Sequence, residues 1–357
     1  FDSRALAHAN RCLGNDENLP GLEMVVEGPT LKFTAARRIA LSGAALTAQL
    51  DGAPIPQNQA ITVDAGQTLS LKGIGAQGDG LRAYLAVEGG FAITPVLGSA
   101  ATFELGGFGG HGGRTLLPGD VLHVGEAPAA ASQALPESLR PSYGKEWTVR
   151  VIYGPHGAPD FFTEKDMCTF FDTDWEVHYN SSRTGVRLIG PKPEWAREDG
   201  GEAGLHPSNI HDNAYAIGAV DFTGDMPVIL GPDGPSLGGF VCPVTLIKAD
   251  LWCLGQLRAG DSIRFVPVTL EQAEQAERDQ LNMIDTLSMP APVDVTSTPP
   301  RDAVLARMPA NDDRPQVVWR PAGDDNMLVE YGPQELDLRL RFRVQALMDW
   351  LQANAVP

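Results

Sequence analysis

A short unit that joins a glycine-containing turn to a strand pattern occurs three times in this chain, and it constrains the fold most. Its copies read VDAGQTLSL, LLPGDVLHV and LRAGDSIRF, at Val63–Leu71, Leu116–Val124 and Leu257–Phe265. In each copy the turn leads into alternating apolar and polar residues, which is the period of a half-buried strand. Units of this kind close β-meanders and β-barrels, so the sequence predicts a mainly β fold.

Similar patterns predict further elements. Alternation marks strands in RAYLAVEGG after Leu81, in WTVRVIYG at Trp147–Gly154 and in MPVIL at Met226–Leu230. The opening residues FDSRALAHANRCLGN read as a helix that is already under way, which suggests a piece of a longer protein. A helical period also runs through Leu270–Leu287.

The end of the sequence reads as part of another domain. Val317–Trp319 and Met327–Tyr331 have the pattern of a hairpin, and apolar residues from Val344 to Leu351 fall at helical spacing. A hairpin with one helix cannot bury its apolar face alone, so the rest of that domain is expected from elsewhere. The predicted organisation is a first β-rich unit at 1–125, a linker at 126–144, a second β-rich unit with the candidate site at 145–268, a helix and linker at 269–315, and an incomplete second lobe at 316–357.

Charge and composition exclude several classes of function. The formal net charge of −18 repels phosphate, so nucleic acid and anionic membrane surfaces are poor partners. No apolar run approaches the roughly 20 residues of a spanning helix, and no signal sequence opens the chain. The protein is therefore predicted to be soluble and cytoplasmic. The four cysteines show no C-x-x-C spacing, which argues against a zinc cluster.

Three motifs carry little weight. The glycine-rich ELGGFGGHGGR at Glu104–Arg114 matches neither phosphate-binding fingerprint, and a surface loop is favoured. His206 and His211 would need distant ligands to hold a metal, so hydrogen bonds to loop backbone are favoured and no metal is predicted. YNSSRTG at Tyr179–Gly185 lacks an evident base partner, which weakens a serine hydrolase reading.

One stretch of the sequence holds several carboxylates and no strongly basic residue. From Glu198 to Ile247 the chain has no lysine or arginine. Asp233, in Pro-Asp-Gly, is typical of a turn. Asp225 is typical of a residue whose side chain hydrogen-bonds the backbone of its own loop. Asp221 lies inside a strand pattern, where aspartate is disfavoured, so it is the strongest candidate for a functional carboxylate.

Three cations border this stretch: Arg183, Arg187 and Lys248. Two interpretations stay open for them. They fix a carboxylate or a urea-like carbonyl of a ligand, or they form ordinary ion pairs with some of the acids.

At this point the sequence resembles a known family, the carboxyltransferase domain of biotin-dependent urea carboxylase, part of urea amidolyase, and of guanidine carboxylase. The resemblance covers about 1–268 and looks like allophanate hydrolase subunit 2, followed by the start of a subunit 1-like lobe. It rests on the segments FDSRALAHANRCLGNDENLPGLEMVVEGPTLKF, LRAYLAVEGGF, LGSAATFELGGFGGHGGRTLLPGDVL, VIYGPHGAPDFFT and the run from YNSSRTG to LIKADLW.

The resemblance implies a fold and a reaction. The fold would be cyclophilin-like β-barrel lobes with a few helices. The reaction would move a carboxyl group from carboxybiotin, held on a separate carrier domain, to a nitrogen of guanidine or urea. ATP would be used by a separate biotin carboxylase domain, and a second carboxyltransferase lobe would complete the protein.

The resemblance also implies roles for individual residues. Asp221 would bind the substrate with Asn209 and Arg183, while Lys248, Asp225 and His206 would be catalytic, and Ser181, Ser182 and Gly239 would line the biotin path. The family position matched by Asp221 is Asn in urea-selective members and Asp in guanidine-selective ones. A carboxylate grips a guanidinium with two charge-assisted hydrogen bonds, so the sequence favours guanidine, with urea as the alternative if Asp221 pairs with a cation.

Two other readings remain. The subunits of 5-oxoprolinase share the general pattern but are expected to lack HPSNIHDNAYAIG and FTGDMP. Relatives of these lobes also act as a protein-binding pair that regulates a histidine kinase, which predicts an exposed apolar interface and no dependence on biotin.

Overall fold

The computed structural model describes residues 1–357 apart from 79, 128–130, 198–205, 293–301, 334–336 and 355–357. This part of the chain forms two compact units. The first unit comprises Phe1–Trp147, Leu251–Ser262 and Gln275–Asp294. The second comprises Thr148–Asp250, Ile263–Glu274 and Val295–Pro357.

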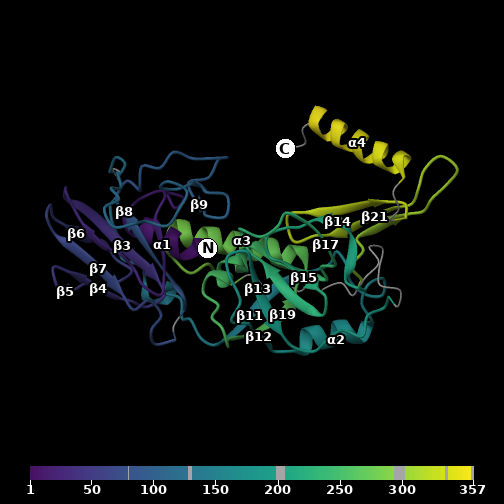
Figure 1. Ribbon diagram of the computed structural model, residues 1–357, viewed down its shortest axis with the longest axis horizontal. Helices are drawn as coiled ribbons and strands as arrows, with labels where there is room; N and C mark the ends of the chain where they lie inside the picture. The colour runs from purple at the N-terminus through teal and green to yellow at the C-terminus, as the bar shows by residue number, and fades with distance from the viewer. Residues whose placement is uncertain (79, 128–130, 198–205, 293–301, 334–336, 355–357) are drawn as a thin grey trace. The chain divides into compact units, whose positions relative to one another are not determined.

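Two four-stranded sheets share a core in the first unit (Figure 1), where Ile39 and Leu85 of one sheet pack with Leu71 of the other. The sheet orders are β1-β8-β3-β6 and β2-β7-β4-β5. The strands are β1 (Leu22–Val25), β2 (Thr30–Lys32), β3 (Arg37–Gly43), β4 (Thr47–Leu50), β5 (Ala53–Pro54), β6 (Ile61–Val63), β7 (Thr68–Lys72) and β8 (Arg82–Val87), with a small pair β9 (Thr102–Phe103) and β10 (Phe108–Gly109).

The predicted first helix is confirmed as α1 (Ser3–Cys12). Its N-cap is Asp2, whose Oδ1 accepts the N–H of Ala5 at 2.8 Å. This contact satisfies one of the free N–H groups at a helix start. Ala9 and Cys12 are buried against the first sheet, so α1 covers the face that the shared core does not use.

A closed barrel of seven strands forms the centre of the second unit, in the order β11-β18-β15-β16-β13-β12-β19. The predicted mainly β fold with barrel character is therefore confirmed. The barrel strands are β11 (Glu146–Tyr153), β12 (Trp175–Val177), β13 (Gly185–Ile189), β15 (Ala219–Thr223), β16 (Met226–Leu230), β18 (Val244–Leu246) and β19 (Ser262–Pro267).

The other elements lie between the barrel strands in sequence or follow them. They are α2 (Glu164–Asp172), the two-stranded sheet of β14 (Asn209–Ala214) and β17 (Leu237–Phe240), the 3-10 helix η2 (Lys248–Gly255), α3 (Leu270–Thr286), the sheet β20 (Ala306–Met308), β21 (Val317–Pro321) and β22 (Met327–Tyr331), and α4 (Leu338–Ala353). The predicted helix at Leu270–Leu287 and the predicted terminal hairpin and helix are confirmed. A further 3-10 turn, η1 (Glu137–Leu139), lies in the first unit.

The prediction for the second turn-strand copy is wrong. Val63–Leu71 and Leu257–Phe265 do lead into β7 and β19, but Leu116–Val124 contains a turn and no strand. Its neighbouring segment pairs with it at a single bridge, between Phe91 and Val124. A strand needs a continuous partner for its backbone groups, and alternation of side chains does not supply one.

Two stretches that were predicted as linkers contain packed structure. Leu135 and Leu139 are buried in the cluster beneath α1. In the later stretch, β20 pairs with β21 along Ala306–Met308. Local composition indicated linkers there because proline and alanine suppress periodicity, whereas burial depends on distant partners.

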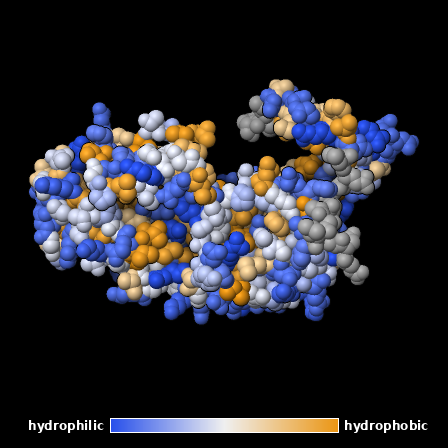
Figure 2. All heavy atoms as spheres, in the orientation of Figure 1, coloured by the Kyte–Doolittle hydropathy of each residue, from blue (hydrophilic) through white to orange (hydrophobic). Residues whose placement is uncertain are grey.

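The last helix, α4, carries apolar side chains that lie open at the surface (Figure 2), among them Phe342, at 69% exposure, and Trp350, at 55%. No residue of α4 is buried. Among the described helices, none is long and apolar enough to cross a bilayer.

Candidate functional site

Strand β15 brings Asp221 into a buried position on the barrel. Asp221 lies opposite Val228 of β16, and Val228 lies opposite Arg187 of β13. Residues directly opposite in an antiparallel ladder point to the same face, so Asp221 and Arg187 share one face of three neighbouring strands. The structure thus supplies a cation that the local sequence does not.

The carboxyl group of Asp221 is poorly satisfied. It is 4% exposed, and its Oδ1 has no hydrogen-bond partner among the residues that the structure describes. Burial raises the pKa of Asp221 to about 6, against the Arg187 guanidinium and a hydrogen bond with Thr223, both of which lower it. A buried acceptor without a donor is costly, so this oxygen is a place where a ligand N–H would be stabilising.

The two-stranded sheet of β14 and β17 packs over the face of Asp221. Tyr215 and Cys242 belong to the same apolar cluster as Val228. The Tyr215 hydroxyl accepts the N–H of Phe240 at 2.7 Å and donates to its carbonyl oxygen at 3.1 Å, which ties the end of β14 to β17. Burial, reinforced by the nearby Asp221 charge, raises the pKa of the Cys242 thiol. Apart from Arg187, the groups named around Asp221 are therefore apolar or neutral.

Two predicted site residues, Asn209 and Gly239, lie on this same two-stranded sheet. Asn209 is paired with Phe240, next to Gly239. A side chain at Gly239 would bring its Cβ to 2.9 Å from the Ile210 carbonyl oxygen, so the close approach of the two strands requires glycine.

A second group of polar side chains gathers around Trp195. Its Nε1 donates to Asp225 Oδ1 at 3.1 Å, and its ring meets that of His206 edge-on at 5.5 Å. Lys192 Nζ lies 3.2 Å from Asp225 Oδ2, and His206 Nε2 lies 3.4 Å from Oδ1. Burial would raise the pKa of Asp225, but the bonds from Trp195 and Lys192 outweigh it and lower the pKa.

Asp166 places Trp195 in this group. Its carboxylate closes the capping box of α2 with Thr163 and also accepts the N–H groups of Glu194, at 2.7 Å, and Trp195, at 3.1 Å. Trp195 has φ of 62°, a left-handed conformation that bulky residues rarely adopt. Such strain persists only where the surroundings hold it, as Asp166 does here.

The hydrogen bonds of His206 limit its chemistry. Its Nδ1 accepts the backbone N–H of Ser208 at 3.2 Å and lies 3.0 Å from the Ser208 hydroxyl. The neutral ring therefore carries its proton on Nε2, which faces Asp225. In this arrangement both nitrogens are engaged, so His206 orients Asp225 and has no lone pair left for a general base.

The two groups lie on opposite faces of β15. Successive side chains of a strand alternate, so Phe222 points away from the face of Asp221. The Phe222 ring lies 5.8 Å from that of Trp195 and 5.1 Å from that of Phe162. The structure thus brings His206 and Asp225 together, but on the Phe222 side rather than beside Asp221.

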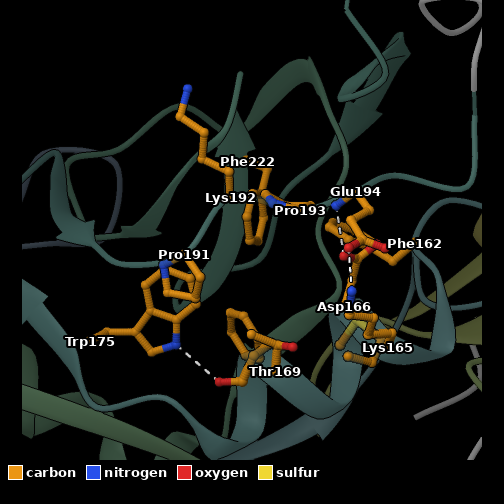
Figure 3. Close-up of a pocket in the computed structure, with 12 residues that line it drawn as sticks. Phe162, Lys165, Asp166, Thr169, Trp175, Pro191, Lys192, Pro193, Glu194 and Phe222 are labelled. Atoms are coloured by element: carbon orange, nitrogen blue, oxygen red, sulfur yellow. Dashed lines mark hydrogen bonds and ion pairs between the residues drawn. The ribbon is translucent and has the colours of Figure 1, made fainter.

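A small cavity of about 180 Å³ also opens on the Phe222 side (Figure 3). Four aromatic rings line it together with charged and proline side chains, and the Lys192 side chain extends away from the other labelled residues. The residues that line it are Phe162, Lys165, Asp166, Met167, Thr169, Phe170, Trp175, Pro191, Lys192, Pro193, Glu194 and Phe222. One of them, Lys192, also pairs with Asp225.

The remaining predicted residues already have partners. Arg183 Nε contacts Asp233 Oδ2 at 2.6 Å, and Lys248 Nζ contacts Asp325 Oδ2 at 2.9 Å. For Arg183 the ordinary ion pair, which the sequence left open, is the arrangement present. Its predicted contact with substrate would require the Asp233 pair to open.

Ser181 and Ser182, two of the residues predicted to line a biotin path, make hydrogen bonds within one turn. Ser181 Oγ donates to the His178 carbonyl at 2.7 Å and accepts the Arg187 N–H at 3.1 Å. Ser182 Oγ bonds Thr184 Oγ1 at 2.7 Å. These bonds lie within the turn of the two serines, and their place on a biotin path stays a prediction.

The described residues also lack the grouped ligands that a metal site needs. In the described ranges, no three His, Cys, Asp or Glu side chains are grouped so that they could hold an ion. The four cysteines form no disulfide in that part of the chain; Cys168 is exposed and the other three are buried.

Sequence reasoning missed Trp195, Lys192 and Asp325. Trp195 and Lys192 stand in PKPEWARED, where only the conjunction of an aromatic with acids gave a weak signal. Arg187 was noted but not assigned to the site, because its proximity to Asp221 arises from the register of three strands.

The stability of an Asp221 variant at two pH values tests whether this carboxylate is buried. Because its pKa in the folded protein lies above the ordinary value of 3.8, the folded state binds the proton more tightly than the unfolded state does. This contribution to stability is present below about pH 4 and is lost as pH rises through about 6. We expect Asp221→Asn to raise the free energy of unfolding by about 2 to 3 kcal/mol at pH 8 and not at pH 4. Thermal unfolding at both pH values measures this, and an equal effect at both would contradict the buried charge.

The chain is similar to several known proteins. A family model described as carboxyltransferase domain, subdomain A and B, matches residues 1–267. Urea amidolyase of Lachancea kluyveri is 44% identical over 365 residues, which cover 98% of this chain and 20% of that protein. A putative urea carboxylase of Emericella nidulans is 39% identical over 374 residues, covering 99% of this chain and 30% of that protein. A 5-oxoprolinase subunit from Escherichia coli is 32% identical over 292 residues, covering 81% of this chain and 88% of that protein.

A solved structure agrees with these relatives. The crystal structure of the Kluyveromyces lactis urea carboxylase matches with a TM-score of 0.93 at 43% identity, covering 99% of this chain and 33% of that one. The chain spans about a fifth of the length of the urea amidolyase. The family match extends over most of the chain and includes the barrel strand that holds Asp221. The chain belongs to the carboxyltransferase domain family with subdomains A and B.

Proposed function

We propose that this chain is the carboxyltransferase part of a biotin-dependent carboxylase that transfers a carboxyl group to a nitrogen of urea. The relatives named for urea amidolyase and urea carboxylase support this substrate. Biotin, when bound on a separate carrier domain, would supply the carboxyl group. ATP would be consumed by a separate biotin carboxylase domain, and the protein would act in the cytoplasm.

The observation that carries the proposal is the shared face of Asp221 and Arg187. Urea presents N–H donors and one carbonyl acceptor. The Asp221 carboxylate accepts an N–H, and the Arg187 guanidinium donates to the carbonyl oxygen, so the two groups orient the substrate between them. Enclosure by Tyr215 and Cys242 excludes water from the same face.

Guanidine is the second candidate, favoured by the carboxylate of Asp221. Guanidinium is a cation at pH 7 and would neutralise that carboxylate. Arg187, however, already places a positive charge on this face and is the main charged group that lowers the pKa of Asp221. A second cation would be repelled, whereas neutral urea uses both groups. Urea is therefore favoured here, although the sequence favoured guanidine.

Carboxylation-dependent ATP hydrolysis by the full-length enzyme, with urea and with guanidine as separate substrates, tests the choice. We expect kcat/KM for urea to exceed that for guanidine by at least about tenfold, because the wrong substrate leaves Arg187 opposed by like charge. A preference for guanidine would contradict the role of Arg187. Turnover of neither substrate would overturn the carboxyltransferase proposal.

The ionisation of Asp221 should appear in the pH profile. Its pKa of about 6 means that the carboxylate needed to accept an N–H is lost below that pH. We expect kcat/KM for urea to rise with pH through about 6 in the parent enzyme, and this limb to be absent in Asp221→Asn. An unchanged limb in the variant would assign it to another group.

The partner would be a second carboxyltransferase lobe. The exposed apolar residues of α4, including Phe342 and Trp350, are what such a lobe would cover. The remaining assignments of catalytic roles to Lys248, Asp225 and His206 stay predictions, with Asp225 and His206 acting from the Phe222 side of β15.

A further inference from the structure

The turn between β21 and β22 reaches Lys248 with two consecutive aspartates. The Ala322 N–H donates to the Asn326 carbonyl at 2.9 Å and closes the turn. Asp324 Oδ2 accepts the backbone N–H of Lys248 at 2.9 Å, and Asp325 Oδ2 contacts its Nζ at the same distance. Both the backbone and the ammonium of Lys248 are therefore held by this turn, which lies outside the residues that the family model matches.

The turn between β21 and β22 packs closely against the barrel. Gly323 has φ of 87°, and a Cβ there would lie 3.1 Å from Thr245 Cγ2. A Cβ at Gly154 would lie 2.8 Å from the Pro321 carbonyl oxygen. These approaches leave no room for larger residues, so the hairpin delivers Asp324 and Asp325 to a defined position.

The two aspartates differ in how firmly they hold Lys248. Asp324 bonds a backbone group and keeps the turn in place. The Lys248 and Asp325 side chains are 40% and 53% exposed, and an ion pair in contact with water opens at little cost. The ammonium can therefore exchange one carboxylate for another while the turn stays where it is.

We propose that Asp325 is an internal substitute for a substrate carboxylate at Lys248. It occupies the ammonium while the site is empty and leaves when an anionic carboxylate, such as that of a carboxylated ureido group, takes its position. The exchange breaks one ion pair and forms another, with no covalent change. The identity of the donor rests on the proposed function; the exchange itself rests on the Lys248–Asp325 contact.

Chemical labelling of Lys248 tests the exchange without any catalytic assay. The parent, Asp325→Asn and Asp174→Asn are treated with acetic anhydride at pH 8, and acetylation of Lys248 is followed by peptide mass spectrometry. Asp174 forms a comparable exposed pair with Arg264 and serves as the matched control. We expect Lys248 to be acetylated several times faster in Asp325→Asn than in the parent, and at the parental rate in Asp174→Asn.

Competition with sodium formate completes the test. Formate should slow acetylation of Lys248 in Asp325→Asn at a several-fold lower concentration than in the parent, because the Asp325 carboxylate no longer competes with it. Equal acetylation rates in the parent and Asp325→Asn would overturn the proposal. Faster acetylation without stronger protection would also overturn it, since Lys248 would then not be a carboxylate site. Because neither reading involves urea or ATP, failure here is distinct from failure of the proposed carboxylation.

Discussion

Arg187→Met should lower kcat/KM for urea by about 100-fold, because a charged hydrogen bond to the substrate carbonyl contributes roughly 1.5–3 kcal/mol. The guanidinium shares a face of β13, β16 and β15 with Asp221, and methionine keeps much of the length of the side chain without its charge. Guanidine should respond differently: removal of the like charge should leave its kcat/KM unchanged or raise it. The ratio of the two constants, measured on the full-length enzyme, therefore moves toward guanidine.

Arg264→Met is the matched control for this experiment. Arg264 also projects from a barrel strand, but it pairs with Asp174 at the surface. We expect both substrates to be used as in the parent enzyme. A loss with Arg187→Met that is equal for urea and guanidine would point to a general structural defect, and retention of full urea activity would remove Arg187 from the site.

Arg320→Met should lower the free energy of unfolding by about 3–5 kcal/mol, the usual cost of removing one partner from a buried ion pair. Arg320 is 6% exposed; its Nη2 contacts Asp160 at 2.7 Å and its Nε contacts Glu330 at 2.6 Å. Burial acts to lower the pKa of Arg320, yet the bonds to both carboxylates outweigh it and raise the pKa. Without the guanidinium, Glu330 in particular is left as a largely buried charge.

Thermal unfolding is the suitable measurement, because urea and guanidinium resemble the candidate substrates. The double variant Arg320→Met, Glu330→Gln should recover part of the loss, since it also removes the buried negative charge of Glu330. Arg339→Met serves as the control: Arg339 is 90% exposed and pairs with Asp337, so its loss should cost less than about 1 kcal/mol. A similar loss in Arg339→Met and Arg320→Met would show that burial of the pair has no special weight.

Patterns within one segment predicted much of the fold. Alternation located β8, β11 and β16, and a helical period located α3, because both periods are properties of consecutive residues. The same reasoning failed at Leu116–Val124, where alternation is present but a continuous strand partner is absent from the described segment beside it. It also missed the burial of Leu135 and Leu139 in a stretch without periodicity.

The candidate site, like the fold, could be predicted only in part from the sequence. Asp221 was identifiable from sequence because a carboxylate inside an apolar strand is locally anomalous, and the family resemblance was carried by continuous segments. The partners of that carboxylate were not identifiable. Arg187 reaches the face of Asp221 only through the register of β13, β16 and β15.

By itself, then, the sequence determined which segments become strands and helices, which family the chain resembles, and which carboxylate deserves a functional explanation. The tertiary structure alone decided that Asp221 faces a cation, that His206 and Asp225 lie on the other face of β15, and that Asp325 holds Lys248. The physical reason is that periodicity and propensity act between near neighbours in sequence. Charge pairing and burial act between groups that only the closed barrel and its docked hairpin bring together.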